Sequence, residues 1–102
     1  MALINISTVR KKTLSVLAKI TPPGGVELLS YKRNRSFAII KQDDEKFLVK
    51  ERGYLEQEVV SDINSLPRVL KEMIKREFPR SRKVRLVIFQ DPAELERQRQ
   101  KI

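Results

Sequence analysis

Residues 66–78, LPRVLKEMIKREF, carry the clearest structural pattern in this chain. Their apolar side chains recur three or four residues apart, at Leu66, Val69, Leu70, Met73, Ile74 and Phe78. This spacing places all of them on one side of an α-helix and predicts a long amphipathic helix packed on a core. Pro67 fits the first turn of such a helix, and Pro79 ends it.

The segment after this helix has the pattern of a buried strand. Residues 84–89, VRLVIF, are apolar except for Arg85, which is typical of a strand covered on most of both faces. Asp91 and Pro92 then predict the N-cap and the first residue of a last helix over residues 91–102. That helix is polar on nearly all sides, so we expect it to fray, dock or pair with another chain.

Four short extended segments precede the long helix. They cover residues 26–33, 37–42, 46–51 and 54–60, and polar or glycine-containing turns separate them. Such a series predicts an antiparallel meander. Before it, apolar residues at helical spacing predict an amphipathic helix over residues 6–19, capped by Asn5 or Ser7.

The predicted order is therefore helix, four strands, helix, strand, helix. We expect a single α+β domain over residues 1–102, since 102 residues are one domain's worth of chain. A four-stranded antiparallel meander plus a fifth strand should pack against the long helix and the N-terminal helix, with a short C-terminal helix at the end. The most buried positions should include Leu70, Ile74, Leu86 and Ile88.

The composition excludes several kinds of chemistry. The chain has no Cys and no His, which removes disulfides, thiolate metal sites and the usual general base near neutral pH. Asp43, Asp44 and Glu45 lack the spacing of a calcium loop and are expected to form a solvated turn. We therefore expect no metal, no cofactor and no catalytic residues. With no long apolar run and no signal-peptide pattern, a cytoplasmic protein without a membrane partner is expected.

Charge gives the first positive indication of a partner. The 22 Lys and Arg residues outnumber 13 Asp and Glu residues, for a net charge of +9. Residues 1–35 contain seven basic residues and one acidic residue, residues 36–67 four and seven, and residues 68–86 eight and two. This segregation favours a basic face, and a basic face favours nucleic acid as the partner.

Two dense clusters supply the candidate binding residues. One lies at the first predicted hairpin and the other between the long helix and the last strand. Arg side chains can grip phosphates in two places at once, and Tyr or Arg planes can stack on unpaired bases. The candidates are Tyr31, Lys32, Arg33, Arg35, Tyr54, Lys75, Arg76, Arg80, Arg82, Lys83 and Arg85.

The element order is similar to that of double-stranded RNA-binding domains, which run helix, three strands, helix. This chain has a fourth strand before the second helix and no basic cluster over residues 62–67. The order also looks like that of the small basic single-stranded DNA-binding proteins of some hyperthermophilic archaea. Both resemblances rest on architecture and charge, so no site residues are carried over.

The leading hypothesis is a non-enzymatic nucleic-acid-binding protein that contacts the backbone largely independently of sequence, with single-stranded DNA or RNA favoured. A protein–protein interaction or assembly domain is the alternative, and a small histidine-free nuclease is the third. A homodimer or larger homo-oligomer is also expected, in which Glu56, Glu58 and Asp62 of one subunit could face cations of the next.

Overall fold

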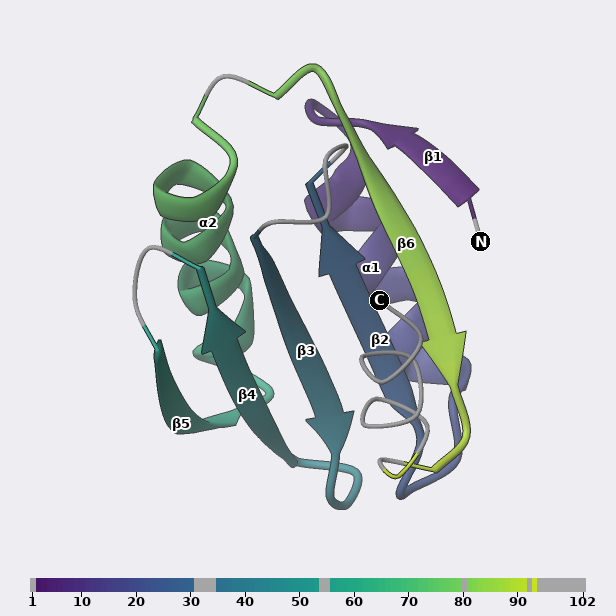
Figure 1. Ribbon diagram of the computed structural model, residues 1–102. Helices are drawn as coiled ribbons and strands as arrows, with labels where there is room; N and C mark the ends of the chain where they lie inside the picture. Colours follow the sequence, from purple (N-terminus) through teal and green to yellow (C-terminus); the bar gives the residue numbers. More distant parts are fainter. Residues whose placement is uncertain (1, 31–34, 54–55, 80, 92, 94–102) are drawn as a thin grey trace.

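The structure is a computed structural model that describes residues 2–30, 35–53, 56–79, 81–91 and 93. These residues form a sheet and two helices of the α+β class, as predicted (Figure 1). In chain order the elements are β1 (Ala2–Asn5), α1 (Val9–Lys19), β2 (Gly25–Leu29), β3 (Ser36–Lys41), β4 (Lys46–Arg52), β5 (Glu56–Asp62), α2 (Leu66–Glu77) and β6 (Lys83–Phe89).

The six strands form one antiparallel sheet in the order β1-β6-β2-β3-β4-β5. The predicted meander is confirmed as β2 to β5, in which each strand pairs with the next along the chain. Strand β6 is inserted between β1 and β2, so it is an inner strand, as its apolar sequence predicts. The sheet therefore ends at β1 on one side and at β5 on the other.

Strand β1 corrects the prediction that the first element is a helix over residues 6–19. It pairs with β6 from Ala2 opposite Leu86 to Asn5 opposite Lys83, and α1 begins only at Val9. Four residues are too few for an alternating pattern to be recognised in the sequence. The strand depends on its partner, because hydrogen bonding along β6 supplies what local propensity does not.

The turn between β1 and α1 is built around Asn5. Its side-chain oxygen accepts hydrogen bonds from the backbone N–H of Ser7 at 2.9 Å and from the Ser7 hydroxyl at 2.8 Å. Neither residue is the N-cap, which is Thr8. Asn5 thus positions the start of the helix from outside it, by shaping the turn.

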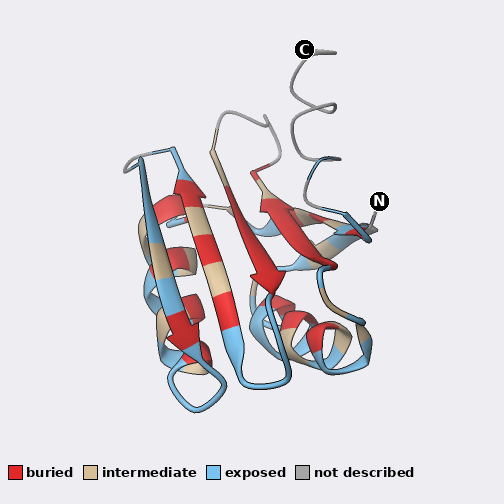
Figure 2. Ribbon diagram, turned by 90° about the horizontal axis from the view of Figure 1, so that it is seen from below, coloured by how far each residue is buried: buried red, intermediate tan, exposed pale blue. Residues whose placement is uncertain are grey.

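Both helices cover the same face of the sheet, which confirms the expected layering (Figures 1 and 2). Their buried side chains form one core with the strands. The core comprises Val9, Leu17, Val26, Leu28, Phe37, Ile39, Phe47, Val49, Leu66, Leu70, Met73, Phe78, Val84 and Leu86. The rings of Phe37 and Phe78 lie 5.6 Å apart between β3 and the end of α2, which ties this helix to the sheet.

The ends of α2 follow the sequence signals closely. An Asp62 side-chain oxygen accepts a hydrogen bond from the backbone N–H of Ser65 at 2.7 Å, just before the helix. Pro67 lies in the first turn, and the helix stops at Glu77, two residues before Pro79. Both prolines stand where a missing N–H costs no helical hydrogen bond.

The face of the sheet opposite the helices, called the second face below, has a smaller apolar cluster. Ala38, Ile40 and Phe89 are buried there, with Leu48 packed against them. Gly25 is the cross-strand neighbour of both Ile40 and Phe89. A Cβ atom at Gly25 would collide with the backbone oxygen of Ile39 and would lie 2.7 Å from the Phe89 ring, so only glycine leaves enough space here.

The predicted C-terminal helix over residues 91–102 lies almost entirely outside the described residues. Within them, an Asp91 side-chain oxygen accepts a hydrogen bond from the backbone N–H of Ala93 at 2.9 Å. This is the bond that an N-cap Asp is expected to make. Neither helix in the described part of the chain is long and apolar enough to cross a membrane.

Candidate nucleic-acid interface

The fold brings the described residues of the two predicted basic clusters to one end of the sheet. Because neighbouring strands alternate in direction, β2 and β4 end where β3, β5 and β6 begin. Helix α2 also ends there, before the chain enters β6 (Figure 1). Arg35 precedes β3, Lys75 and Arg76 close α2, and Arg82 and Lys83 open β6. Segments far apart in the sequence are thus neighbours at this end.

The candidates at this end differ in accessibility. Lys75, Arg82 and Lys83 are exposed. Arg35 and Arg85 are half-buried, and each interacts with another group. Five further candidates lie outside the described residues: Tyr31, Lys32, Arg33, Tyr54 and Arg80.

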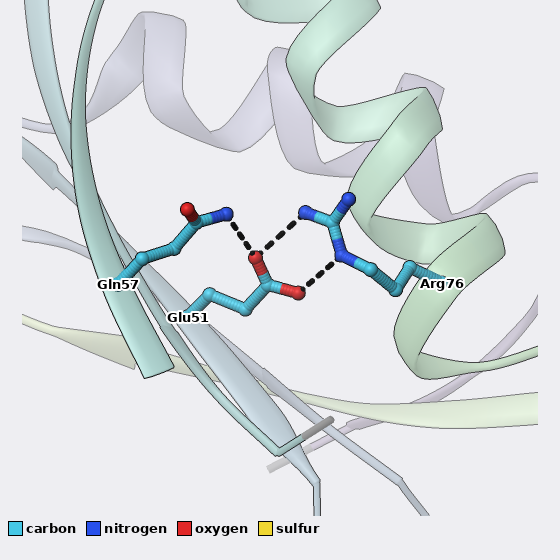
Figure 3. A network of polar contacts seen from close by, with 3 residues as sticks. All are labelled: Glu51, Gln57 and Arg76. Atoms are coloured by element: carbon cyan, nitrogen blue, oxygen red, sulfur yellow. Dashed lines mark hydrogen bonds and ion pairs between the residues drawn. The ribbon is translucent and has the colours of Figure 1, made fainter. Parts of the chain in front are cut away.

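Arg76 is held by a buried carboxylate. Its Nε donates to Glu51 Oε2 at 2.8 Å and its terminal nitrogen to Oε1 at 2.7 Å, a two-pronged contact between α2 and β4 (Figure 3). The side-chain amide of Gln57, on β5, donates to the same Oε1 at 2.8 Å. The guanidinium therefore links helix to sheet, and its donors on this side are not available to a phosphate.

The charge of Glu51 is stabilised by these contacts although the residue is 1% exposed. Burial raises the pKa of its carboxyl, but hydrogen bonds to Arg76, Glu77 and Gln57 outweigh burial and lower the pKa from 4.5 to about 2. The hydrogen bond to Glu51 also raises the pKa of Arg76. Gly53 packs directly against this cluster, since a Cβ atom at this position would collide with the Glu77 side chain.

The outer surface of the two helices is almost purely cationic. Its exposed charged residues are Glu72 and seven cations. The seven cations, called the basic layer below, are Arg10, Lys11, Lys12 and Lys19 of α1 and Arg68, Lys71 and Lys75 of α2. Within the described part of the chain, none of the seven takes part in an ion pair. The two helices contact each other, and both lie on the same face of the sheet.

Of the seven cations in the basic layer, only Lys75 is among the binding residues predicted from the sequence. The cations of α1 are recognisable in the sequence as the polar side of an amphipathic helix. Averaged over the 11 residues of α1, their density is lower than that of residues 80–85. The contact between α1 and α2 cannot be predicted from either helix alone.

A groove runs beside the basic layer, between α1 and β1. It has a volume of about 540 Å³. Its lining combines an apolar floor with hydroxyl, amide and ammonium groups, from Leu3, Ile4, Asn5, Thr8, Lys11, Lys12 and Ser15. The groove therefore gives the sheet edge at β1 a partly basic border.

The sheet itself carries charges of both signs. Lys50 of β4 is paired with Glu58 of β5 at 3.5 Å, and Arg52 of β4 lies opposite Glu56 of β5. Each of the two glutamates therefore has a cation beside it on the neighbouring strand. On the same face, burial raises the pKa of Glu27, while the positive charge of Arg52 lowers it. Positive charge is thus balanced on the second face but not on the helices.

The acidic turn before β4 behaves as a solvated turn. An Asp43 side-chain oxygen accepts hydrogen bonds from the backbone N–H groups of Glu45 and Lys46, both at 2.8 Å. Those hydrogen bonds lower the pKa of Asp43. No group of three or more metal-ligating side chains lies together among the described residues.

Comparison of the chain with protein-family models, with curated proteins and with solved structures found no match.

Proposed function

We propose that this protein is a non-enzymatic nucleic-acid-binding protein, which grips phosphates with its basic layer. The observation that carries the proposal is the set of seven exposed cations on two touching helices, with a single exposed carboxylate among them. Three cations outside the basic layer have a local partner: Arg76 has Glu51, Lys50 has Glu58, and Lys41 has a backbone carbonyl. A surface of unpaired cations favours a polyanion.

The mechanism is neutralisation of the phosphate backbone. Helix α1 has 11 residues. At about 1.5 Å per residue it is about 17 Å long, a length that covers roughly five phosphates of one strand in a duplex. Each Lys or Arg that neutralises a phosphate releases condensed counterions, which favours binding and makes it dependent on salt. Such contacts carry no base information, so binding is largely independent of sequence.

The sequence-nominated residues extend this interface at one end. Exposed Arg82 and Lys83 follow the end of α2, close in the chain to Lys75 of the basic layer. Arg80, Tyr31 and Tyr54 belong to the same proposal, with the tyrosines stacking on bases of single-stranded DNA or RNA. Arg76 is left out, because Glu51 occupies its guanidinium.

Two double variants with the same loss of charge test the placement. Lys71→Gln with Lys75→Gln removes two cations from the basic layer, and Lys46→Gln with Lys50→Gln removes two from the sheet. Affinity for a heterologous single-stranded oligonucleotide is measured across a salt series. Each lost phosphate contact should reduce the slope of log K against log salt by about 0.7, so the helix double should reduce it by about 1.4 in total.

The sheet double should leave the slope close to that of the unchanged chain. Equal effects of the two doubles would show that only net charge matters and would contradict an interface on the helices. Flat or absent binding by the unchanged chain would contradict nucleic-acid binding altogether.

A further inference from the structure

The two outer strands of the sheet run in opposite directions. Six strands alternate without exception from β1 to β5, so a second copy in the same orientation would place its β1 antiparallel to β5 of the first. The joint would continue the sheet and keep all the helices on one face. Among the described strands, none pairs with the outer side of β1 or of β5.

The backbone of each outer strand has groups that point outward at known positions. Next to the end of β5, the backbone N–H of Ile63 donates to the backbone oxygen of Glu45 at 2.8 Å. The backbone groups of the odd-numbered residues of β5 therefore point toward β4. Those of the even-numbered residues Glu58 and Val60 point outward, away from the sheet. On β1, Ile6 N–H donates to Arg82 O at 2.8 Å, so Leu3 directs its backbone groups outward, away from β6.

The side chains at these positions are matched in type and face. Leu3 is 47% exposed and Val60 63% exposed. If they lie opposite each other, both are on the second face, and the half-buried Ile4 and Val59 meet on the helix face. Cross-strand pairs of apolar side chains stabilise a sheet. The groove along β1 leaves space for the incoming strand beside α1.

Charge decides between this joint and the symmetric ones. Strand β5 carries Glu56, Glu58 and Asp62 and no cation. Pairing β5 with itself would bring these carboxylates together, and like charges across strands are destabilising. Pairing β1 with itself would bring together two grooves lined by Lys11 and Lys12. The mixed joint avoids both of these contacts between like charges.

We propose that copies of this chain associate head to tail, with β5 of one copy paired to β1 of the next. A joint of this kind uses two different surfaces, so it generates open chains or rings of copies. The proposal does not depend on nucleic-acid binding and is tested on the protein alone. Because each copy has a net charge of +9, the test is made in salt that screens the repulsion between copies.

Two proline variants block one edge each. Val60→Pro and Leu3→Pro each remove an N–H that points outward, and neither removes a hydrogen bond to the neighbouring strand of the same copy. The unchanged chain should show a mass in sedimentation equilibrium that rises continuously with concentration. Each variant alone should stay monomeric. An equimolar mixture should form a two-copy species and nothing larger, because one working edge remains on each variant.

Three outcomes would overturn the proposal. They are a monomeric unchanged chain at high micromolar concentration, self-association of either variant at the strength of the unchanged chain, and a mixture that stays monomeric while the unchanged chain associates. Val60→Thr and Leu3→Val keep the N–H and should associate normally. If a proline variant fails to fold by circular dichroism, Val60→Lys and Leu3→Lys replace it, since an edge lysine also blocks strand pairing.

Discussion

At the scale of single residues, two buried polar side chains, Lys41 and Glu51, join the sheet to the helices. Lys41 of β3 is 7% exposed, and its ammonium donates to the carbonyl oxygen of Leu17 at 3.0 Å, near the C-terminal end of α1. This satisfies one of the carbonyls that a helix end leaves unpaired. The hydrogen bonds between Arg76 and Glu51 likewise join α2 to β4. Neither link is visible as a motif in the sequence.

The Glu51 carboxylate should make stability depend on pH in acid. Its pKa is lowered from 4.5 to about 2 in the folded protein, so its contribution is complete above pH 4.5 and is lost as the pH falls through 2. At about 1.4 kcal/mol per pKa unit, the contribution is about 3 kcal/mol. Glu51→Gln should lower the free energy of unfolding by that amount at neutral pH, and by progressively less toward pH 2, in urea titrations.

Glu58→Gln is the matched control for this prediction. Its carboxylate is 61% exposed in the pair with Lys50, and exposed pairs contribute less than about 1 kcal/mol. A loss in Glu51→Gln no larger than in Glu58→Gln, or a loss that does not change between pH 4.5 and 2, would contradict the role of the buried pair.

At the scale of elements, long periodic segments were predictable and short or partner-dependent ones were not. The stripe of α2 is strong enough to predict the helix and its apolar face from residues 66–78 alone. Strand β1 has no such pattern, because it exists through pairing with β6. Ile88 shows the same limit: it was expected in the core but is 56% exposed, and it lies beyond Leu86, the last residue of β6 that is paired with β1.

Within α2, Leu70 and Ile74 differ in burial, although the sequence pattern predicts both to be buried. Leu70 is completely buried, whereas Ile74 is only half-buried at the edge of the core. Leu70→Ala should therefore cost about 2–5 kcal/mol of unfolding free energy, and Ile74→Ala clearly less. Chemical denaturation of the two variants measures both. A larger loss for Ile74→Ala would mean that the helix is rotated about its axis relative to the sheet.

At the scale of the whole molecule, the fold places basic and acidic residues in different regions, a separation that the sequence indicates only in part. Helices α1 and α2 put the basic layer on one side, while the acidic residues of β5 lie at one edge of the sheet. The charged blocks of the sequence predict a basic face, but the individual binding residues were predicted from the local density of Lys and Arg along the chain. That Lys11 of α1 and Lys71 of α2 lie on the same side of the sheet follows only from the packing of two helices that four strands separate in the chain.

The most direct test of the proposed interface is a titration of the isotope-labelled full chain with a heterologous single-stranded oligonucleotide, followed by backbone amide chemical shifts. The largest shifts should fall in α1 and α2, over residues 9–19 and 66–77, with smaller ones near Arg82 and Lys83. Amides in β4 and β5 should change little. Shifts concentrated in β3 to β5, or none at saturating oligonucleotide in low salt, would contradict binding through the basic layer.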